Sequence, residues 1–468
     1  MAERSRKRNS SAVVESNSKR RFVPDSDEDE DQDASRVPSP LPEESQQTFP
    51  EVVLKSFYKK PGVLLIAGCV SWDNVAKRDS NGENIHPNLY TFHKFTDRKY
   101  RLIVSGCDSG HSILVSTSGE CYTFGRNNYG QLGLGDTTTR YVPELVPELT
   151  GKNIIHAATG KHHSLFVTDT GTVYACGDNK HGQLGIGNNT PQYKTPTRIR
   201  YKGPPVVKAG CGSNFSMILD CNGALHSFGL PEFGQLGHNT DGKYFMTSNR
   251  LAFNLQAIPK KIAAYFEKQR DGRMNPITNV EIVDFSCGNN HTVAIDSLKR
   301  VFSWGFGGYG RLGHSDPKDV AVPLLIRSFQ GSSRGVKSVY CGSKFTLAVN
   351  ELGMLYLFGQ PKPTGEANMY PKPMQDLMGW NVQCMGAGHT SMLFAADDTL
   401  IAMGASPTYG ELGLGFTCGS TTRAKEVYSM AGMKYSQIAM GYSHSMLLVD
   451  DSTDEVKQKL EAIPTYSP

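Results

Sequence analysis

The sequence GRNNYGQLGLG, residues 125–135, decides the fold because variants of it return along the chain at a nearly fixed spacing. They occur at 177–187 (GDNKHGQLGIG), 229–238 (GLPEFGQLGH), 305–314 (GFGGYGRLGH) and, one residue longer, 404–415 (GASPTYGELGLG). The leading glycines Gly125, Gly177 and Gly229 are 52 residues apart twice running. A period of about 40–50 residues indicates a solenoid, a propeller or an array. A residue that recurs once per repeat is therefore expected to be architectural, and one that breaks the pattern is a candidate for function.

A second signature, Gly-x-x-His/Phe-Ser/Thr, alternates with the first. Its copies are Gly160–Ser164, Gly212–Ser216, Gly288–Thr292, Gly342–Thr346, Gly386–Thr390 and Gly441–Ser445, with a weaker one that has Asp108 for the glycine and ends at His111–Ser112. Most copies are followed by two apolar runs joined by a turn, which predicts a β-hairpin. Because such small sheets cannot bury both faces alone, seven of them are expected to pack radially as a β-propeller.

The two ends of the repeat region complete one unit between them. GYSHSMLLVD at 441–450 has half of the hairpin, and VLLIAG at 63–68 has the missing partner strand. We therefore predict an all-β, seven-bladed propeller over residues 51–450, closed by strands from both termini, with roughly 57 residues per blade.

A C-terminal extension, 451–468, follows the repeats. Ser452 and Glu455 have the spacing of a capping box, which predicts a short helix. Val456, Leu460 and Ile463 then form a narrow apolar stripe. Docking of this stripe against the ring is the favoured interpretation, and binding to a partner helix is the second.

Residues 1–50 are polar and rich in Ser and Pro, so we expect a disordered tail. Two basic clusters separated by ten residues match a bipartite nuclear localisation signal, which predicts a nuclear import receptor as a partner; the residues are Lys7, Arg8, Lys19, Arg20 and Arg21. Such clusters can also contact nucleic-acid phosphates, or can simply be solvated. An acidic run then predicts phosphorylation at Ser26, and the Ser-Pro pair predicts it at Ser39.

Composition excludes several classes of protein. No apolar run reaches the length of a membrane helix and no secretory signal is present, so membrane insertion is not expected. The ten cysteines form no CxxC pair. Four of them recur at one repeat position and are interpreted as buried strand residues, which fits reduced thiols in a nuclear or cytosolic protein; they are Cys107, Cys211, Cys287 and Cys341. We expect no metal and no cofactor.

Two features that could indicate an enzyme, a glycine-rich motif and a set of histidines, are explained better as parts of the repeat. GFGGYG at 305–310 matches a dinucleotide fingerprint but lies in register with the other glycine motifs, without a βαβ pattern around it. The histidines of the second signature share their position with Phe215 and Phe345, which indicates packing rather than catalysis; they are His111, His163, His291, His389 and His444. No constellation for covalent catalysis stands apart from the repeats.

One repeat is longer than the others. From Gly229 to Gly305 the spacing is 76 residues, and the excess lies within 239–280. We predict a strand over 260–268, a turn at 270–273 and a second strand near 277–285, since Asp-Gly favours a hairpin. Alternating positions place Ile262, Ala264 and Phe266 on one face and Tyr265 on the other.

The basic tip of this hairpin is a candidate partner-binding site, because recognition residues concentrate on loops held by a rigid scaffold. The candidate residues are Lys268, Gln269, Arg270, Asp271, Gly272, Arg273, Met274 and Asn275. A rim decoration without function and a short helix through 263–269 are the alternatives.

Five Gly-x-Leu-Gly motifs alternating with seven His/Phe-Ser/Thr motifs resemble the regulator of chromosome condensation family of seven-bladed propellers, across nearly all of 60–450. SFGLPEFGQLGHNTDGKYF, RVFSWGFGGYGRLGH, MYPK and GYSHS resemble one branch of that family in particular. This resemblance implies a mitotic regulator in the nucleus and nucleolus, partly cytoplasmic, that reaches centromeres and the spindle midzone. It further implies binding to small GTPases of the Rac and Ral type, to chromatin and to microtubules.

The founding member of the family is a guanine nucleotide exchange factor for Ran, and members of that kind press a hairpin toward the nucleotide site. We therefore hypothesise a monomeric nuclear propeller that binds a small GTPase at 268–275 and regulates it, for example by promoting nucleotide release. The alternative is a non-catalytic scaffold for mitotic chromatin or spindle complexes. A hairpin tip serves either role.

Overall fold

The computed structural model describes residues 48–72, 88–331, 333–362, 365–404, 409–418 and 421–467. Contacts divide the chain into two units, Met1–Pro40 and Leu41–Pro468, and all described residues belong to the second. The predicted import and phosphorylation residues lie outside the described residues; they are Lys7, Arg8, Lys19, Arg20, Arg21, Ser26 and Ser39.

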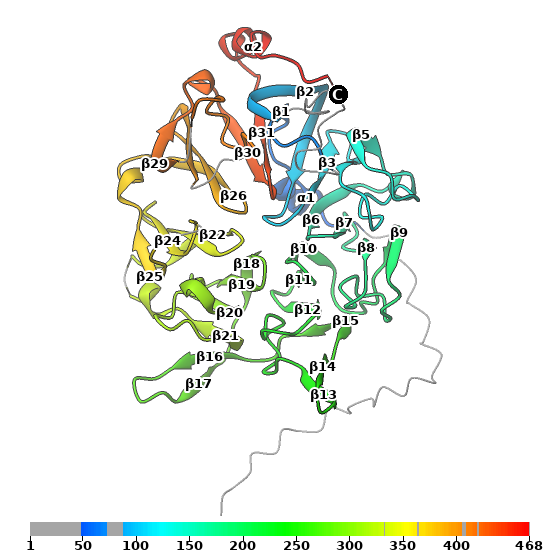
Figure 1. Ribbon diagram of the computed structural model, residues 1–468, viewed down its shortest axis with the longest axis vertical. Coiled ribbons are helices and arrows are strands. Elements are labelled where there is room, and N and C mark those ends of the chain that lie inside the picture. The colour runs from blue at the N-terminus through cyan, green and yellow to red at the C-terminus, as the bar shows by residue number, and fades with distance from the viewer. Residues whose placement is uncertain are drawn as a thin grey trace, which may run out of the picture. The chain divides into compact units, whose positions relative to one another are not determined.

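The described residues of the second unit form a ring of antiparallel sheets around a central axis (Figure 1). Three of the sheets are β6–β9 (Ile154–Thr159, His163–Thr168, Val173–Asp178, Gln192–Arg198), β22–β25 (Val336–Cys341, Phe345–Asn350, Leu355–Gly359, Asn368–Pro373) and β26–β29 (Val382–Ala387, Ser391–Ala396, Thr399–Gly404, Thr421–Glu426). A fourth joins β10 (Val206–Cys211), β11 (Phe215–Asp220), β12 (Leu225–Gly229) and β15 (Gln256–Lys261).

The fifth sheet has six strands, in the order β17-β16-β21-β20-β19-β18. Their bounds are β16 (Tyr265–Lys268), β17 (Met274–Ile277), β18 (Ile282–Cys287), β19 (His291–Asp296), β20 (Val301–Gly305) and β21 (Val320–Leu325). A separate two-stranded sheet contains β13 (Lys243–Thr247) and β14 (Arg250–Phe253). Short 3-10 turns occur at Pro147–Leu149, Gly308–Gly310, Arg327–Phe329, Gln375–Leu377 and Tyr428–Met430.

The remaining seven strands form one continuous sheet, in the order β30-β31-β1-β2-β3-β4-β5. They are β1 (Gly62–Gly68), β2 (Leu89–Val104), β3 (His111–Ser116), β4 (Cys121–Gly125), β5 (Arg140–Leu145), β30 (Tyr435–Met440) and β31 (His444–Val449). The prediction of a seven-bladed ring is therefore corrected: besides the small β13–β14 sheet, five sheets of four or six strands stand alone, and the last seven strands are joined in one sheet. The physical reason is the length of β2, which pairs with β1 over 89–100 and with β3 over 100–104.

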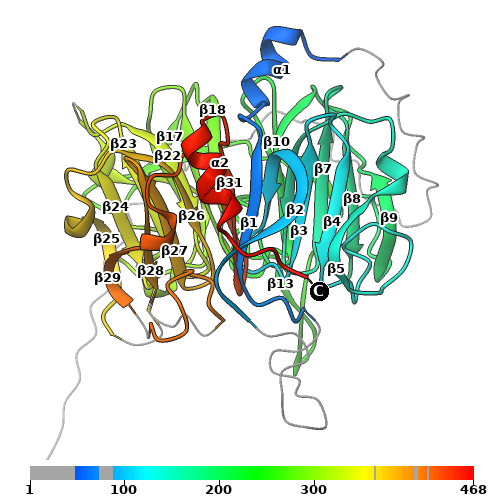
Figure 2. The same ribbon diagram turned by 90° about the horizontal axis from the view of Figure 1, so that it is seen from above.

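The predicted closure by both termini is confirmed. β1 pairs with β31 without interruption from Val63↔Val449 to Gly68↔His444. The C-terminal extension then covers the same region: helix α2 (Asp454–Glu461) buries Val456 and Leu460 in a cluster with Leu447, as the apolar stripe predicted. α2 lies at the outer rim beside β1 and β31 (Figures 1 and 2).

The predicted capping box of Ser452 and Glu455 does not form. The N-cap of α2 is Thr453 rather than Ser452, and its side chain makes no capping hydrogen bond. The other helix, α1 (Glu51–Phe57), precedes the ring, and Figure 2 shows it above one face, with β13 toward the opposite face. No helix among the described residues is long and apolar enough to cross a membrane.

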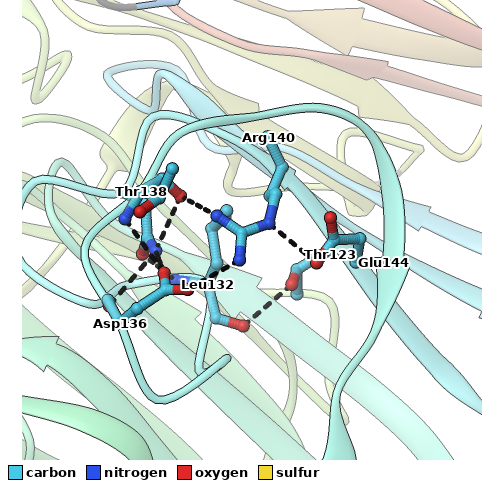
Figure 3. A network of polar contacts seen from close by, with 7 residues as sticks. Thr123, Leu132, Asp136, Thr138, Arg140 and Glu144 are labelled. Carbon is cyan, nitrogen blue, oxygen red and sulfur yellow. Dashed lines mark hydrogen bonds and ion pairs between the residues drawn. The ribbon is translucent and has the colours of Figure 1, made fainter.

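The first signature forms a loop that is held together by hydrogen bonds among its own residues (Figure 3). Asn127 accepts from the Leu132 amide at 3.0 Å through Oδ1 and donates to Asp136 Oδ1 at 3.0 Å through Nδ2. Leu132 is fully buried. Gly133 has φ +72°, and a Cβ there would lie 3.0 Å from Pro196 Cγ of the next sheet, so the close approach requires glycine. Arg140 then pairs with Asp136 at 2.6 Å and Glu144 at 2.7 Å.

The second signature links neighbouring repeats through buried side chains. The histidine Nε2 atoms lie at hydrogen-bond distance from the Ser or Thr oxygen of the next repeat; the pairs are His111–Ser164 (2.8 Å), His163–Ser216 (2.9 Å), His291–Thr346 (3.0 Å) and His444–Ser112 (2.8 Å). Phe215 and Phe345 are equally buried at this position. The packing interpretation is confirmed for these four histidines, and burial lowers the pKa of His163 and of His444 to about 3.

The assignment of His389 to the histidine position of the second signature is corrected by the structure. The Gly388 amide donates to Ser391 O at 2.8 Å, as the Gly160 amide donates to His163 O at 2.8 Å. Ser391 therefore occupies the histidine position, and His389 lies two residues earlier, on the loop. The signature fits the sequence only from Gly386, which places His389 and Thr390 at its last two positions. The strand pairing instead makes Gly388 the equivalent glycine and places Ser391 and Met392 there.

The four repeat cysteines are free thiols, as expected. Cys107, Cys211 and Cys341 are buried and Cys287 is half-buried. Burial raises the pKa of Cys341 to about 12, so its thiol is protonated at neutral pH. Among the described residues, no group of three or more His, Cys, Asp or Glu side chains is placed to hold a metal ion.

Candidate functional site

The long repeat connects two sheets of the ring. β15 pairs with β12, and after a short break β16 pairs in parallel with β21 of the next sheet through Phe266↔Leu324. The predicted continuous strand over 260–268 is therefore wrong, since β15 ends at Lys261 and β16 begins at Tyr265. The break also overturns the predicted faces: Ile262 and Tyr265 are buried while Ala264 is exposed, because the alternation does not continue across the crossing.

The predicted hairpin itself is confirmed. β16 and β17 pair from Tyr265↔Ile277 to Lys268↔Met274. The turn is closed by the Gln269 amide, which donates to Arg273 O at 2.7 Å, and Gly272 adopts φ +88°. The second strand begins at Met274 rather than near 277, and the alternative helix over 263–269 does not form.

The base of the hairpin is fixed to the ring. The buried Tyr265 ring packs edge-on against Phe302, with 5.2 Å between the ring centroids. Arg327 Nε lies 3.9 Å from Glu267 Oε1. These contacts fix where the two strands leave the ring, so the direction of the hairpin is set by the core.

The tip is free of the ring. Of the eight predicted residues, seven are exposed and Gln269 is half-buried; the seven are Lys268, Arg270, Asp271, Gly272, Arg273, Met274 and Asn275. Arg273 Nε lies 3.3 Å from Asp271 Oδ2, and the Arg273 side chain is 83% exposed. A surface pair of this kind contributes little to stability. Figure 1 shows β16 and β17 extending outward from the ring.

The hairpin forms one wall of a groove that the sequence did not predict. The groove has a volume of about 720 Å³, and its other wall is the segment 313–328. Its lining is rich in charged side chains: Lys268, Arg270, Lys318 and Arg327, together with Asp316 and Asp319. The signal that could have located this second wall is the repeat register, because residues 315–320 directly follow the glycine signature of the repeat that β16 joins.

A second hairpin was also missed. β13 and β14 pair from Lys243↔Phe253 to Thr247↔Arg250. Phe245 is 73% exposed and Met246 is 55% exposed. The sequence Thr-Ser-Asn between the two runs is a usable turn signal.

The residues that break the second signature meet across the ring. Asp108 stands where other repeats have glycine, and its carboxylate accepts from Ser213 Oγ at 2.7 Å and lies 3.6 Å from His389 Nδ1. Burial would raise the pKa of Asp108, but His389 and Ser213 outweigh it and hold the pKa below the ordinary value. Three separate sheets thus contribute to this polar cluster.

These observations define a β-propeller of repeats with one projecting hairpin, and comparison with known proteins identifies the class. The Regulator of chromosome condensation (RCC1) repeat matches residues 118–167, 170–219, 222–295 and 300–349. The chain belongs to this family.

Within the family, the chain is similar to Protein RCC2. It is 44% identical to Protein RCC2 of Mus musculus over 419 residues, which are 88% of this chain and 81% of that protein. It is 43% identical to Protein RCC2 of Homo sapiens, over 88% of this chain and 80% of that protein.

Solved structures agree on the fold. Prp20p from Saccharomyces cerevisiae, described with its binding properties to Gsp1p and histones, superposes with a TM-score of 0.67 and 17% identity over 87% of this chain and 96% of Prp20p. Yeast RCC1 (Prp20) bound to Kap60 gives a TM-score of 0.69 and 17% identity over 91% of this chain and 98% of that one. At such identity the likeness establishes the propeller alone.

Proposed function

We propose that this protein is a nuclear regulator that binds a small GTPase, of the Rac or Ral type, through residues 268–275 at the tip of the β16–β17 hairpin. The observation that carries the proposal is the contrast within that hairpin. Its base is held by Tyr265 and the pairing to β21, whereas its tip presents Arg270 and Arg273 to solvent.

This arrangement suits nucleotide exchange without any bond chemistry. A GTPase releases its nucleotide faster when a partner binds the nucleotide-free form more tightly than the loaded one. The guanidinium groups of Arg270 and Arg273 can pair with acidic side chains or phosphate at the nucleotide site. Because the base of the hairpin is fixed, contact at the tip acts on the partner rather than on the ring.

The further partners that we propose are suggested by two solved structures of similar fold. Prp20p has been described with its binding to Gsp1p and histones, and yeast RCC1 with Kap60. By analogy with them, we propose that this protein engages an import receptor through its N-terminal basic clusters and binds chromatin. From the family resemblance of the sequence we further propose that it acts as a monomer in mitosis at centromeres, the spindle midzone and microtubules, with a nucleolar pool.

Release of a fluorescent nucleotide from a panel of small GTPases tests the proposal. Arg270→Ala combined with Arg273→Ala is expected to weaken binding of the responsive GTPase by about tenfold or more, since each charged contact is worth about 1–3 kcal/mol. Arg423→Ala removes an exposed arginine on β29, away from both hairpins; it is the matched control and leaves affinity unchanged. Equal affinities for the double variant and the control would contradict the placement.

A non-catalytic scaffold is the second candidate. The exposed Phe245, Met246 and Leu251 of the β13–β14 hairpin favour it, because exposed apolar side chains gathered on one element mark interaction sites. A GTPase that binds with the same dependence on Arg270 and Arg273, but releases nucleotide at its intrinsic rate, would establish the scaffold.

A further inference from the structure

The loop between the last strand of one sheet and the first strand of the next has the same design at several places in the ring, for example at Val146 and at two neighbouring places further along. The Met374 amide donates to Leu355 O at 2.9 Å, and the Val427 amide donates to Leu400 O at 2.8 Å. In both loops a 3-10 turn follows at once, and the next sheet begins eight residues after the donor, at Val382 and at Tyr435. Leu377, Met378 and Trp380 therefore correspond to Met430, Ala431 and Met433.

The second of these loops is covered by helix α2 of the same chain. Val456 and Leu460, one helical turn apart, pack in the cluster that contains Met430 and Met433. Met430 and Met433 are each only 1% exposed. Lys459 Nζ donates to Ala431 O at 2.9 Å, which satisfies a carbonyl of the loop.

The first loop has an open pocket instead. Its volume is about 340 Å³, and its apolar lining includes Leu352, Met374, Leu377, Met378, Trp380 and Val382. Leu352 is 68% exposed and Met378 is 62% exposed, and Trp380 is only half-buried where Met433 is fully buried. We call this the 352–382 pocket.

A third place in the ring supports the comparison. Phe49, Leu54 and Phe57, in and next to α1, pack against a cluster that contains Ile199 and Val206. Ile199 is the counterpart of Met374, since its amide donates to Val173 O at 3.0 Å. The chain thus covers two of these places with apolar side chains in and next to its own helices. The 352–382 pocket is lined by methionine and leucine side chains, which can adapt to a third helix.

We propose that the 352–382 pocket binds a short amphipathic helix of a partner protein, in the way that α2 covers the neighbouring loop. The helix presents two apolar side chains at i and i+4, as Val456 and Leu460 do, and a lysine at i+3 that donates to Met378 O. Lys337 lines the rim, is exposed and makes no ion pair among the described residues, so the outer face of the helix is acidic. This interaction is independent of the proposed GTPase contact.

The test uses the full chain and a synthetic peptide with the sequence of residues 451–464. A short helix is marginal in water, so a lactam bridge between the exposed side chains of Lys457 and Glu461 locks the peptide. The readout is tryptophan emission. Trp72 and Trp304 are buried, Trp380 is half-buried in the pocket, and the peptide contains no tryptophan. We expect a saturable blue shift as Trp380 is covered.

Leu352→Glu is expected to weaken peptide binding by about tenfold or more, because it places a charge in the apolar contact. The matched control is Leu298→Glu, at the corresponding turn of the preceding repeat, where Leu298 is 67% exposed. It is expected to leave the affinity unchanged. A peptide with Glu at both 456 and 460 should not bind.

Three results would overturn the proposal. The first is no emission shift at millimolar peptide, and the second is an equal shift in the Leu352→Glu variant, since the peptide would then bind elsewhere. The third is a dimer of the protein that disappears both on removal of 452–468 and in the Leu352→Glu variant, because the occupant would then be α2 of a second copy.

Discussion

The ring is closed where β1 pairs with β31, a place we call the seam. The seam and the β16–β17 hairpin both use antiparallel backbone pairing, but with opposite results. At the seam, β1 and β31 come from the two ends of the repeat region, and both are buried along their shared register except at the half-buried Val63. The hairpin pairs mainly with itself, and its link to the ring backbone is the single register pair Phe266↔Leu324. Long-range pairing therefore maintains the ring, while local pairing leaves the hairpin tip free for a partner.

Charged and aromatic side chains also connect distant segments at the seam, whereas at the hairpin tip they connect only neighbouring residues. Lys99 pairs with Asp451 at 2.7 Å across the closure, and Tyr466 of the C-terminal extension stacks on Phe95 with 5.3 Å between centroids. At the hairpin, the Asp271–Arg273 pair lies within the turn itself. We expect the ring to unfold as one unit and the hairpin tip to open locally at much lower free energy.

Removing β31 should have the largest effect. A chain that ends at residue 440 leaves β1 and β30 without their partner and removes fully buried side chains such as Leu447 and Leu448 from the core. The loss exceeds the roughly 5–15 kcal/mol by which domains are stable, so this chain should not fold. A chain that ends at residue 451 retains the closure and should fold with a lower midpoint. Far-ultraviolet circular dichroism and thermal melting distinguish the 1–440 chain from the 1–451 chain. A folded 1–440 chain would contradict the conclusion that pairing of β1 with β31 maintains the ring.

Acid should weaken the ring and spare the hairpin. His163, His444 and His156 have pKa values lowered to about 3 by burial, well below the ordinary value near 6.5. Between these values the unfolded chain binds protons that the folded chain does not, so stability is complete above pH 6.5 and falls as the pH drops. Each histidine contributes about 1.4 kcal/mol per pH unit. Urea midpoints at pH 7, 6 and 5 measure the slope.

A single substitution sharpens this test. His163→Phe introduces the residue type that the next repeat already has at this position, where Phe215 is fully buried. The fold should therefore tolerate the substitution. The variant should show a shallower loss of stability between pH 6.5 and 4 than the original chain. Midpoints that are equal at pH 7 and pH 5 in the original chain would contradict the histidine explanation.

The hairpin tip should show the smallest effect on stability. Arg270→Ala with Arg273→Ala is expected to change the free energy of unfolding by less than about 0.5 kcal/mol, since both side chains are exposed. Tyr265→Ala at the base should cost about 3 kcal/mol through lost packing on Phe302. Urea unfolding of the three chains measures both values. A double arginine variant as unstable as Tyr265→Ala would mean that the tip is structural.

The predictions from sequence failed at identifiable points. The turn at 269–273 was predictable because Asp-Gly acts within four residues. The break between Lys261 and Tyr265 was not, because the chain crosses there from one sheet to the next and period-two alternation carries no information about such a crossing. His389 was misplaced by two residues because the signature fits the sequence only from Gly386, and only the pairing of Ser391 with Gly404 makes Gly388 the equivalent glycine.

By itself the sequence determined the repeating β-hairpins, the closure of the ring by both ends and the basic turn of the insertion, because spacing, alternation and glycine act over short stretches of chain. The tertiary structure alone decided that β2 joins seven strands into one sheet, that Asp108 meets Ser213 and His389, and that α2 covers one loop while the 352–382 pocket stays open. Each of these depends on which distant surfaces come into contact, and contact between distant surfaces is set by packing of the whole ring rather than by any local pattern.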